Sequence, residues 1–172
     1  LSQDPDLRPA LLQEMKDRVA SVDETVPLLA RKYSYQRRFV EGAERPQHWQ
    51  LGDHERLLLD ENIVAKEHAF FRLGVMASDE QEESFFWSAD FKGSEYFEIL
   101  KIGPDAHHQA VGISSAAPNF VVCEDGASIL WVGLDEQHRP KEVNLTDLRT
   151  NETIMLYREP DDAYFMTLVT SA

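Results

Sequence analysis

The sequence has little cysteine, few basic residues and no long apolar run, and each shortage excludes a class of protein. Its 172 residues include one cysteine, Cys123, so neither an internal disulfide framework nor a zinc site built on cysteines can form. Lys and Arg number 17 against 31 Asp and Glu, which gives a formal net charge of −14. This charge argues against binding to nucleic acids or to anionic membrane surfaces. No stretch approaches the ~20 apolar residues of a membrane-spanning helix.

The rest of the composition is that of a folded domain. Hydrophobic residues make up 42% and aromatic residues 10% of the chain, which is enough for a packed core. No secretory leader with a basic start and an apolar middle opens the sequence. Together with the single cysteine, this predicts a cytoplasmic, bacterial-type protein.

Residues 1–25 are expected to form a helical lead-in segment. Leu11, Met15 and Val19 recur at a spacing that places them on one face of an α-helix. Pro27 cannot continue a helix and marks its end. Beyond it the apolar residues alternate with a period of two, which is typical of β-strands, and short strand candidates follow as far as residues 165–170.

A repeat of about 45 residues organises these strands, and it places Val75, Phe120 and Phe165 at equivalent positions of successive inner strands. A period of ~40–50 residues with four strands is typical of a β-propeller blade. We therefore predict a mainly β fold, a partial β-propeller preceded by an N-terminal helix. Its four-stranded antiparallel blades are expected near residues 30–70, 71–117 and 118–164, with the start of a further blade at 165–172.

Closed propellers have about four to eight blades, so residues 26–172 are expected to form an incomplete N-terminal propeller domain. An incomplete propeller leaves an apolar blade face and unpaired strand edges exposed. For this reason we expect the isolated chain to self-associate, through blade-face stacking or strand addition near residues 165–170.

Several segments resemble, in order, the N-terminal part of the oligopeptidase B (protease II) group in the prolyl oligopeptidase family of serine peptidases. Tyr33–Arg38 resembles its Tyr-Tyr-Arg-Arg first strand, and Leu58–Asn62 resembles its Leu-Leu-Asp-x-Asn segment. Leu134–Val143 resembles a Leu-Asp-Glu-x-x-Arg-Pro-x-x-Val stretch of these enzymes. The motif positions that we expect to be structural are Asp60, Asn62, Asp135, Arg139 and Pro140.

The resemblance implies a parent serine peptidase that cleaves short peptides after Lys or Arg. Its propeller would act as a size-filtering lid over a C-terminal hydrolase domain. The Ser-His-Asp triad would lie in that domain, beyond Ala172, so we expect no catalytic residue, metal or cofactor site in this chain. The expected partners are short basic peptides and the hydrolase domain.

Two other functions are compatible with the sequence. One is a stand-alone, non-enzymatic all-β interaction module, which requires a reading frame that ends near Ala172. The other is a small acidic β-barrel that binds a cationic ligand, which requires one closed sheet in place of radially arranged blades.

Five local features have structural interpretations. The Gly-Ile-Ser sequence ending at Ser114 lacks the second glycine of a nucleophile elbow and is expected to be an ordinary loop. His107 and His108 are expected in a solvated loop, since adjacent strand residues point to opposite faces and cannot easily share a metal. Asp79–Glu83 lacks the spacing of a calcium loop and is expected to be an exposed acidic turn. Cys123 is expected to be a buried structural thiol on an inner strand, and the three tryptophans are expected to pack between blades.

Overall fold

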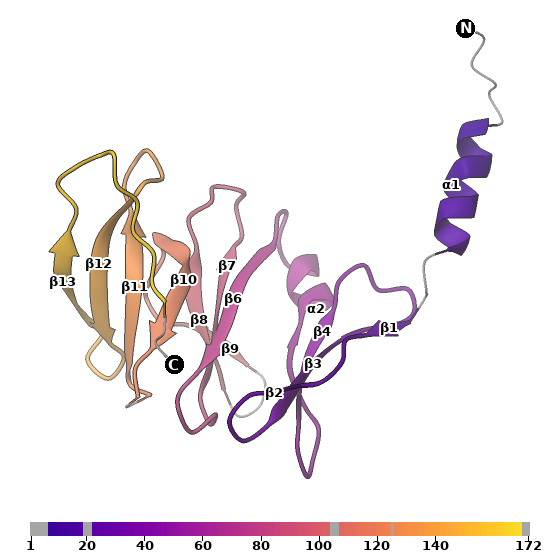
Figure 1. Ribbon diagram of the computed structural model, residues 1–172, viewed down its shortest axis with the longest axis horizontal. Coiled ribbons are helices and arrows are strands. Elements are labelled where there is room, and N and C mark those ends of the chain that lie inside the picture. The colour runs from indigo at the N-terminus through magenta and orange to yellow at the C-terminus, as the bar shows by residue number, and fades with distance from the viewer. Residues whose placement is uncertain (1–6, 19–21, 104–106, 125, 170–172) are drawn as a thin grey trace, which may run out of the picture.

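A computed structural model describes residues 7–18, 22–103, 107–124 and 126–169, and it shows a helix followed by three antiparallel sheets in a row (Figure 1). Helix α1 (Leu7–Asp17) stands apart from the sheets, and none of its residues is buried. Val19, expected on its apolar face, falls outside the described residues. Within the described ranges, neither helix is long and apolar enough to cross a membrane.

The first sheet has four strand positions, one of which is interrupted. Strands β1 and β2 pair with opposite halves of the same edge of β3, so they are two pieces of one outer strand. Pro27 lies between the pieces, where it lacks an N–H group and pushes Val26 out of helical geometry. The sheet begins within the segment expected to be a helical lead-in. Its elements, with the short helix that follows, are β1 (Asp23–Glu24), β2 (Leu28–Leu29), β3 (Ser34–Phe39), β4 (Gln47–Leu51), β5 (Arg56–Asp60) and α2 (Glu61–Lys66).

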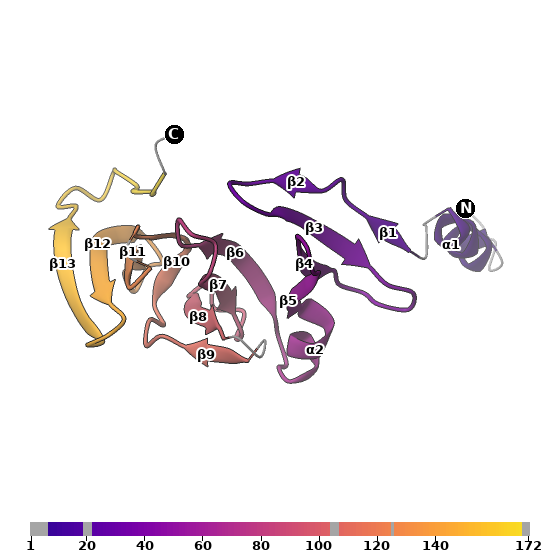
Figure 2. The ribbon, with the colours of Figure 1, turned by 90° about the horizontal axis from the view of Figure 1, so that it is seen from below.

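The second and third sheets each contain four strands in chain order, joined by antiparallel pairing. Figure 2 shows the three sheets side by side. Such meanders, placed face to face, are blades of a β-propeller, so the predicted partial propeller with its N-terminal helix is confirmed. The strands are β6 (Arg72–Ser78), β7 (Phe85–Asp90), β8 (Glu98–Ile102), β9 (His108–Ala110), β10 (Ala116–Val122), β11 (Ser128–Leu134), β12 (Pro140–Asp147) and β13 (Glu152–Arg158).

The strand register corrects the predicted equivalence of Val75 and Phe120. In the second sheet Trp87 pairs with Met76, and in the third sheet Trp131 pairs with Phe120. Phe120 is therefore equivalent to Met76, and the repeat is one residue shorter than expected. A shift of one residue moves a side chain to the other face of a sheet, so Val75 packs against the third sheet whereas Phe120 packs against the second.

The prediction of a further strand at residues 165–170 is wrong for the part of this segment that the structure describes. Residues 165–169 adopt no regular structure, and 72% of the Phe165 surface is exposed. The first strand of a blade is held by hydrogen bonds to the second strand, and the described chain offers no second strand after Phe165.

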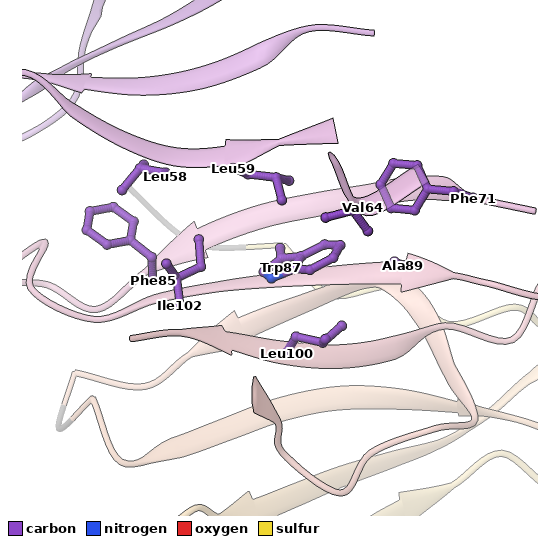
Figure 3. Close-up of a cluster of buried hydrophobic side chains, with 9 residues drawn as sticks. All are labelled: Leu58, Leu59, Val64, Phe71, Phe85, Trp87, Ala89, Leu100 and Ile102. Atoms are coloured by element: carbon purple, nitrogen blue, oxygen red, sulfur yellow. The ribbon is translucent and has the colours of Figure 1, made fainter. Parts of the chain in front are cut away.

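Two apolar clusters form the core, one on each side of β7. Trp87 belongs to the cluster between the first and second sheets, where it faces Leu58 and Leu59 (Figure 3). The neighbouring Phe86 points the other way, into the cluster between the second and third sheets that contains Trp131. The expectation that tryptophans pack between blades is thus confirmed for Trp87 and Trp131, and each indole N–H is also hydrogen-bonded.

Candidate functional site

The two family-motif residues at the end of the first sheet form a local hydrogen-bond network. Asp60 caps α2 by accepting the N–H of Asn62 at 2.9 Å, and its second oxygen accepts from the Gln47 amide at 2.7 Å. The Asn62 side chain accepts the Arg45 N–H at 2.9 Å and donates to the Arg45 carbonyl at 2.7 Å. Burial would raise the pKa of Asp60, but the bonds from Gln47 and Asn62 outweigh it and hold that pKa below its usual value. These contacts fix the β3–β4 loop against α2.

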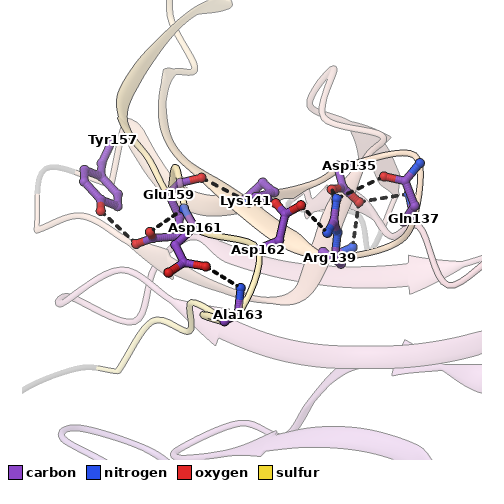
Figure 4. Close-up of polar contacts among 9 residues, drawn as sticks. All are labelled: Asp135, Gln137, Arg139, Lys141, Tyr157, Glu159, Asp161, Asp162 and Ala163. Carbon is purple, nitrogen blue, oxygen red and sulfur yellow. Dashed lines mark hydrogen bonds and ion pairs between the residues drawn. The ribbon is translucent and has the colours of Figure 1, made fainter.

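The other three motif positions lie in the turn between β11 and β12. Asp135 accepts the N–H groups of Gln137 and Arg139, each at 2.9 Å, and the Arg139 Nε donates to its other oxygen at 2.9 Å (Figure 4). These bonds from Arg139 and Gln137 lower the pKa of Asp135. Pro140 begins β12 opposite Leu134, at a register shift. The missing N–H of proline is tolerated at the start of a strand.

The same turn holds the segment that follows β13. Arg139 also pairs with Asp162 at 2.9 Å, and the Lys141 ammonium contacts the same carboxylate. Lys141 is 7% exposed, and it also donates to the Glu159 carbonyl at 3.2 Å. Asp135, Arg139, Lys141 and Asp162 therefore form a clasp between the third sheet and residues 159–163 (Figure 4).

Replacing Arg139 by alanine should lower the melting temperature by only about 2 °C, because ion pairs at an exposed turn contribute little to stability. Arg139→Lys, which keeps the charge and loses the paired N–H donors, should fall between alanine and the native chain. Thermal unfolding followed by circular dichroism measures both variants. In the full-length peptidase that the sequence resemblance implies, an altered kcat/KM for Arg139→Ala at unchanged melting temperature would contradict the structural role and indicate a rim contact.

The structure gives Ser114 and the two histidines separate local surroundings. Ser114 lies on the exposed loop between β9 and β10, and no histidine of the described chain is hydrogen-bonded to it. The prediction that His108 lies in a solvated loop is wrong. His108 lies half-buried on β9, and its Nδ1 accepts the Trp87 N–H at 3.1 Å. Burial lowers the pKa of His108. No cluster of three potential metal ligands occurs among the described residues.

Cys123 is only half-buried and follows the last residue of β10, so its expected place on an inner strand is wrong.

The segment Asp79–Glu83 is not uniformly exposed, which corrects the prediction for it. Asp79 is 7% exposed and accepts the N–H groups of Glu83 and Ser84 at 2.9 and 3.1 Å, closing the β6–β7 turn on itself. Glu82 is 3% exposed and has a positive φ of 56°.

The Glu82 carboxylate, on the β6–β7 turn of the second sheet, binds backbone groups of the first sheet. It accepts the backbone N–H groups of Arg31, Lys32 and Tyr33 at 3.0, 3.0 and 2.9 Å. Burial would raise the pKa of Glu82, but the three donors and the charge of Arg31 outweigh it and leave that pKa below its usual value. We call this contact the Glu82 latch. It joins the β6–β7 turn to the turn between β2 and β3.

A cavity of about 430 Å³ lies beside the latch, between the first and second sheets. Leu58, Met76 and Phe85 supply apolar walls. Tyr35 and Arg37, two residues apart on β3, also line it. Sequence reasoning assigned these two residues to a strand but gave them no role. The period of two places them on one face of the strand, whereas the cavity depends on packing between sheets.

Tyr35 is the unusual member of this lining. Its hydroxyl oxygen is buried and has no hydrogen-bond partner among the residues that the structure describes. Burial, with the nearby charge of Glu82, raises the pKa of Tyr35 to about 12, so the hydroxyl stays protonated at neutral pH and can donate a hydrogen bond.

Comparisons with known proteins place the chain in a family. Residues 1–167 match the family described as the prolyl oligopeptidase N-terminal beta-propeller domain. Dipeptidyl aminopeptidase BI of Pseudoxanthomonas mexicana is 25% identical over 189 residues, which cover 93% of this chain and 25% of that protein.

Two solved structures share the fold. Oligopeptidase B from Leishmania major matches with a TM-score of 0.81 and 23% identity, over 91% of this chain and 24% of that one. Oligopeptidase B from Trypanosoma brucei, in a closed form with covalently bound antipain, matches with a TM-score of 0.79 and 21% identity, over 91% and 23%. The chain thus spans about a quarter of the length of these relatives. Since the family match extends over nearly all of its residues, the chain belongs to the prolyl oligopeptidase family, in which it is an N-terminal β-propeller domain.

Proposed function

We propose that the chain is the N-terminal propeller part of an oligopeptidase B-like serine peptidase that cleaves short peptides after Lys or Arg. The observation that carries the proposal is the family match over residues 1–167. The backbone likeness to two oligopeptidase B structures supports the same fold. The charge of −14 would favour cationic peptides, because a negative surface raises their local concentration.

In this proposal the propeller contributes no reacting group. It acts as a lid that admits short peptides, keeps larger chains out and limits the access of water to the hydrolase domain. Among the described residues, no histidine is hydrogen-bonded to Ser114 of the Gly-Ile-Ser sequence. In the proposal, the triad belongs to the hydrolase domain of the parent protein. We further propose that this parent is cytoplasmic.

The proposal is tested by comparing the isolated chain with a full-length parent protein on reporter peptides. The full-length protein should cleave after Lys or Arg and leave a matched norleucine peptide intact, and the isolated chain should cleave neither. Ser114→Ala should not change kcat/KM of the full-length protein. A long unfolded chain that contains the same cleavage sequence should be cut far more slowly than the short peptide.

Two results would contradict the proposal. Turnover by the isolated chain that Ser114→Ala abolishes would assign a nucleophile to this domain. A full-length protein that prefers the norleucine peptide would contradict the proposed specificity for Lys or Arg. If the reading frame ended near Ala172, the chain would instead act as a stand-alone interaction module.

A further inference from the structure

The cavity between the first and second sheets has the size and lining of a small-molecule site. Its volume of about 430 Å³ lies within the usual range of ligand pockets, about 300–1,000 Å³. Leu58 and Phe85, which form its floor, are 2% and 3% exposed. Met76, which lines the cavity, takes the position in the second sheet that Phe120 takes in the third, and Ala30 lines the cavity as well.

Two polar groups on this lining have no partner among the described residues. The Tyr35 hydroxyl is buried and makes no hydrogen bond. The Arg37 side chain is exposed, and no carboxylate of the described chain pairs with it, whereas the neighbouring Arg38 is paired with Glu55 at 2.8 Å on the opposite face of β3. A buried hydroxyl without a partner costs free energy, so a ligand that accepts its hydrogen bond would be favoured.

Three other polar side chains around the cavity are already engaged. Glu82, whose charge lies near the Tyr35 hydroxyl, accepts three backbone N–H groups. The Gln36 amide donates to the Thr25 carbonyl and accepts from Arg38. His48 contacts Glu61 at 2.7 Å. On β3, the groups left for a ligand are therefore two donors, one neutral and one cationic, beside apolar walls.

We infer that this cavity binds a small apolar carboxylate, with its hydrocarbon part against Leu58, Met76 and Phe85 and its carboxylate between Tyr35 and Arg37. A guanidinium and a hydroxyl donor suit a carboxylate, whose two oxygens only accept hydrogen bonds. A cationic amine would be repelled by Arg37, and the Glu82 carboxylate attracts it less because that group already accepts three backbone N–H groups. Both the C-terminal end of a peptide and a free aryl acid carry this chemistry. The inference does not depend on the proposed peptidase function.

The test titrates the isolated chain with N-acetylphenylalanine and, as a control, N-acetylphenylalaninamide, which has the same body without the charge. Methyl and backbone NMR shifts report binding. We expect a Kd on the order of 1 mM for the acid and binding about tenfold weaker for the amide. The resonances that move should include the Met76 and Leu58 methyl groups.

Matched variants separate specific recognition of the carboxylate from the effect of the overall charge of the chain. Arg37→Gln should weaken binding of the acid about tenfold, and Tyr35→Phe about threefold, without affecting the amide. Arg8→Gln makes the same charge change on α1, away from the cavity, and should leave the Kd unchanged. A melting temperature that is unaltered, or raised, in Tyr35→Phe shows that the weaker binding does not arise from unfolding.

Two further probes distinguish the source of the ligand. N-acetylalanylphenylalanine binding more tightly than 3-phenylpropanoate would indicate the C-terminal end of a peptide, and the reverse order would indicate a free acid. Equal affinity for N-acetylphenylalanine and its amide would overturn the inference. So would equal weakening by Arg37→Gln and Arg8→Gln, or the absence of shifts at Met76 and Leu58. Peptidase assays are not involved, so failure here is distinct from failure of the proposed function.

Discussion

Replacing Glu82 by alanine should lower the free energy of unfolding by about 3 kcal/mol, because it leaves three backbone N–H groups without their acceptor. A hydrogen bond to a charged group contributes about 1.5–3 kcal/mol. Three such bonds would sum to more than our figure, but water can reach the exposed residues Arg31 and Lys32 after the substitution. Equilibrium unfolding in urea, followed by tryptophan fluorescence, measures the change.

Two other substitutions at this position separate the carboxylate from the backbone strain. Glu82 has a φ of 56°, a conformation that glycine adopts without cost. Glu82→Gly should therefore be about 1 kcal/mol less destabilising than Glu82→Ala, although both lack the acceptor. Glu80→Ala, at an exposed position of the same turn, is the control and should change stability by less than about 0.5 kcal/mol. An equal loss for Glu80 and Glu82 would contradict the latch.

The latch should also make stability depend on pH. Because the pKa of Glu82 is lower in the folded chain, its contribution is present above the unfolded value of about 4.3 and is lost as the pH falls through the folded value. The difference in stability between the native chain and Glu82→Gln should therefore shrink as the pH falls below about 4. A difference that stays constant from neutral pH to pH 3 would contradict this expectation.

The latch explains how an interrupted strand stays in the first sheet. β1 and β2 have two residues each, and Pro27 separates them. Strands this short form few hydrogen bonds of their own. Glu82 holds the turn that follows β2 from the side of the second sheet, and the same residue lines the cavity beside Tyr35. The Glu82 latch therefore contributes both to the pairing of the first two sheets and to the wall of the inferred ligand site.

The blade architecture could be predicted from the sequence because its signals are local. Strand candidates separated by polar turns recur at a nearly constant spacing, and each of the two later sheets carries a tryptophan at the same place in its second strand. The register could not be predicted. Every residue of β7 is buried, including the adjacent Phe86 and Trp87, so alternation no longer tells one face from the other. The alignment of Val75 with Phe120 failed by one residue for this reason.

The parts that sequence reasoning missed are short or depend on distant residues. β9 has three residues and α2 has six, too few to show a period. The burial of Glu82 comes from backbone donors about 50 residues earlier in the chain, which an acidic run does not reveal. The orphan hydroxyl of Tyr35 likewise follows from how the sheets face each other. The structural role of motif residues such as Asp60 and Asp135 was easier to predict, because their hydrogen-bond partners are close in sequence.

The outer edge of the third sheet should make the isolated chain self-associate. All seven residues of β13 are exposed, and no described strand pairs with its outer edge. Ile154 and Leu156 are 56% and 53% exposed. An uncovered edge strand with apolar side chains is a template for pairing with a second copy. The contact between copies is therefore expected at β13 and not at residues 165–170. There, the β13 strands of two copies would pair antiparallel about a twofold axis.

Ile154→Lys with Leu156→Lys should abolish this dimer, since charges on an edge strand oppose strand addition. Sedimentation velocity at several concentrations measures the effect. Leu12→Lys in α1 is the matched control, because Leu12 has the same exposed fraction as Leu156, 53%, but lies on a separate element. It should leave the dimer intact. A native chain that is monomeric at all concentrations, or a dimer lost only with Leu12→Lys, would contradict β13 as the contact.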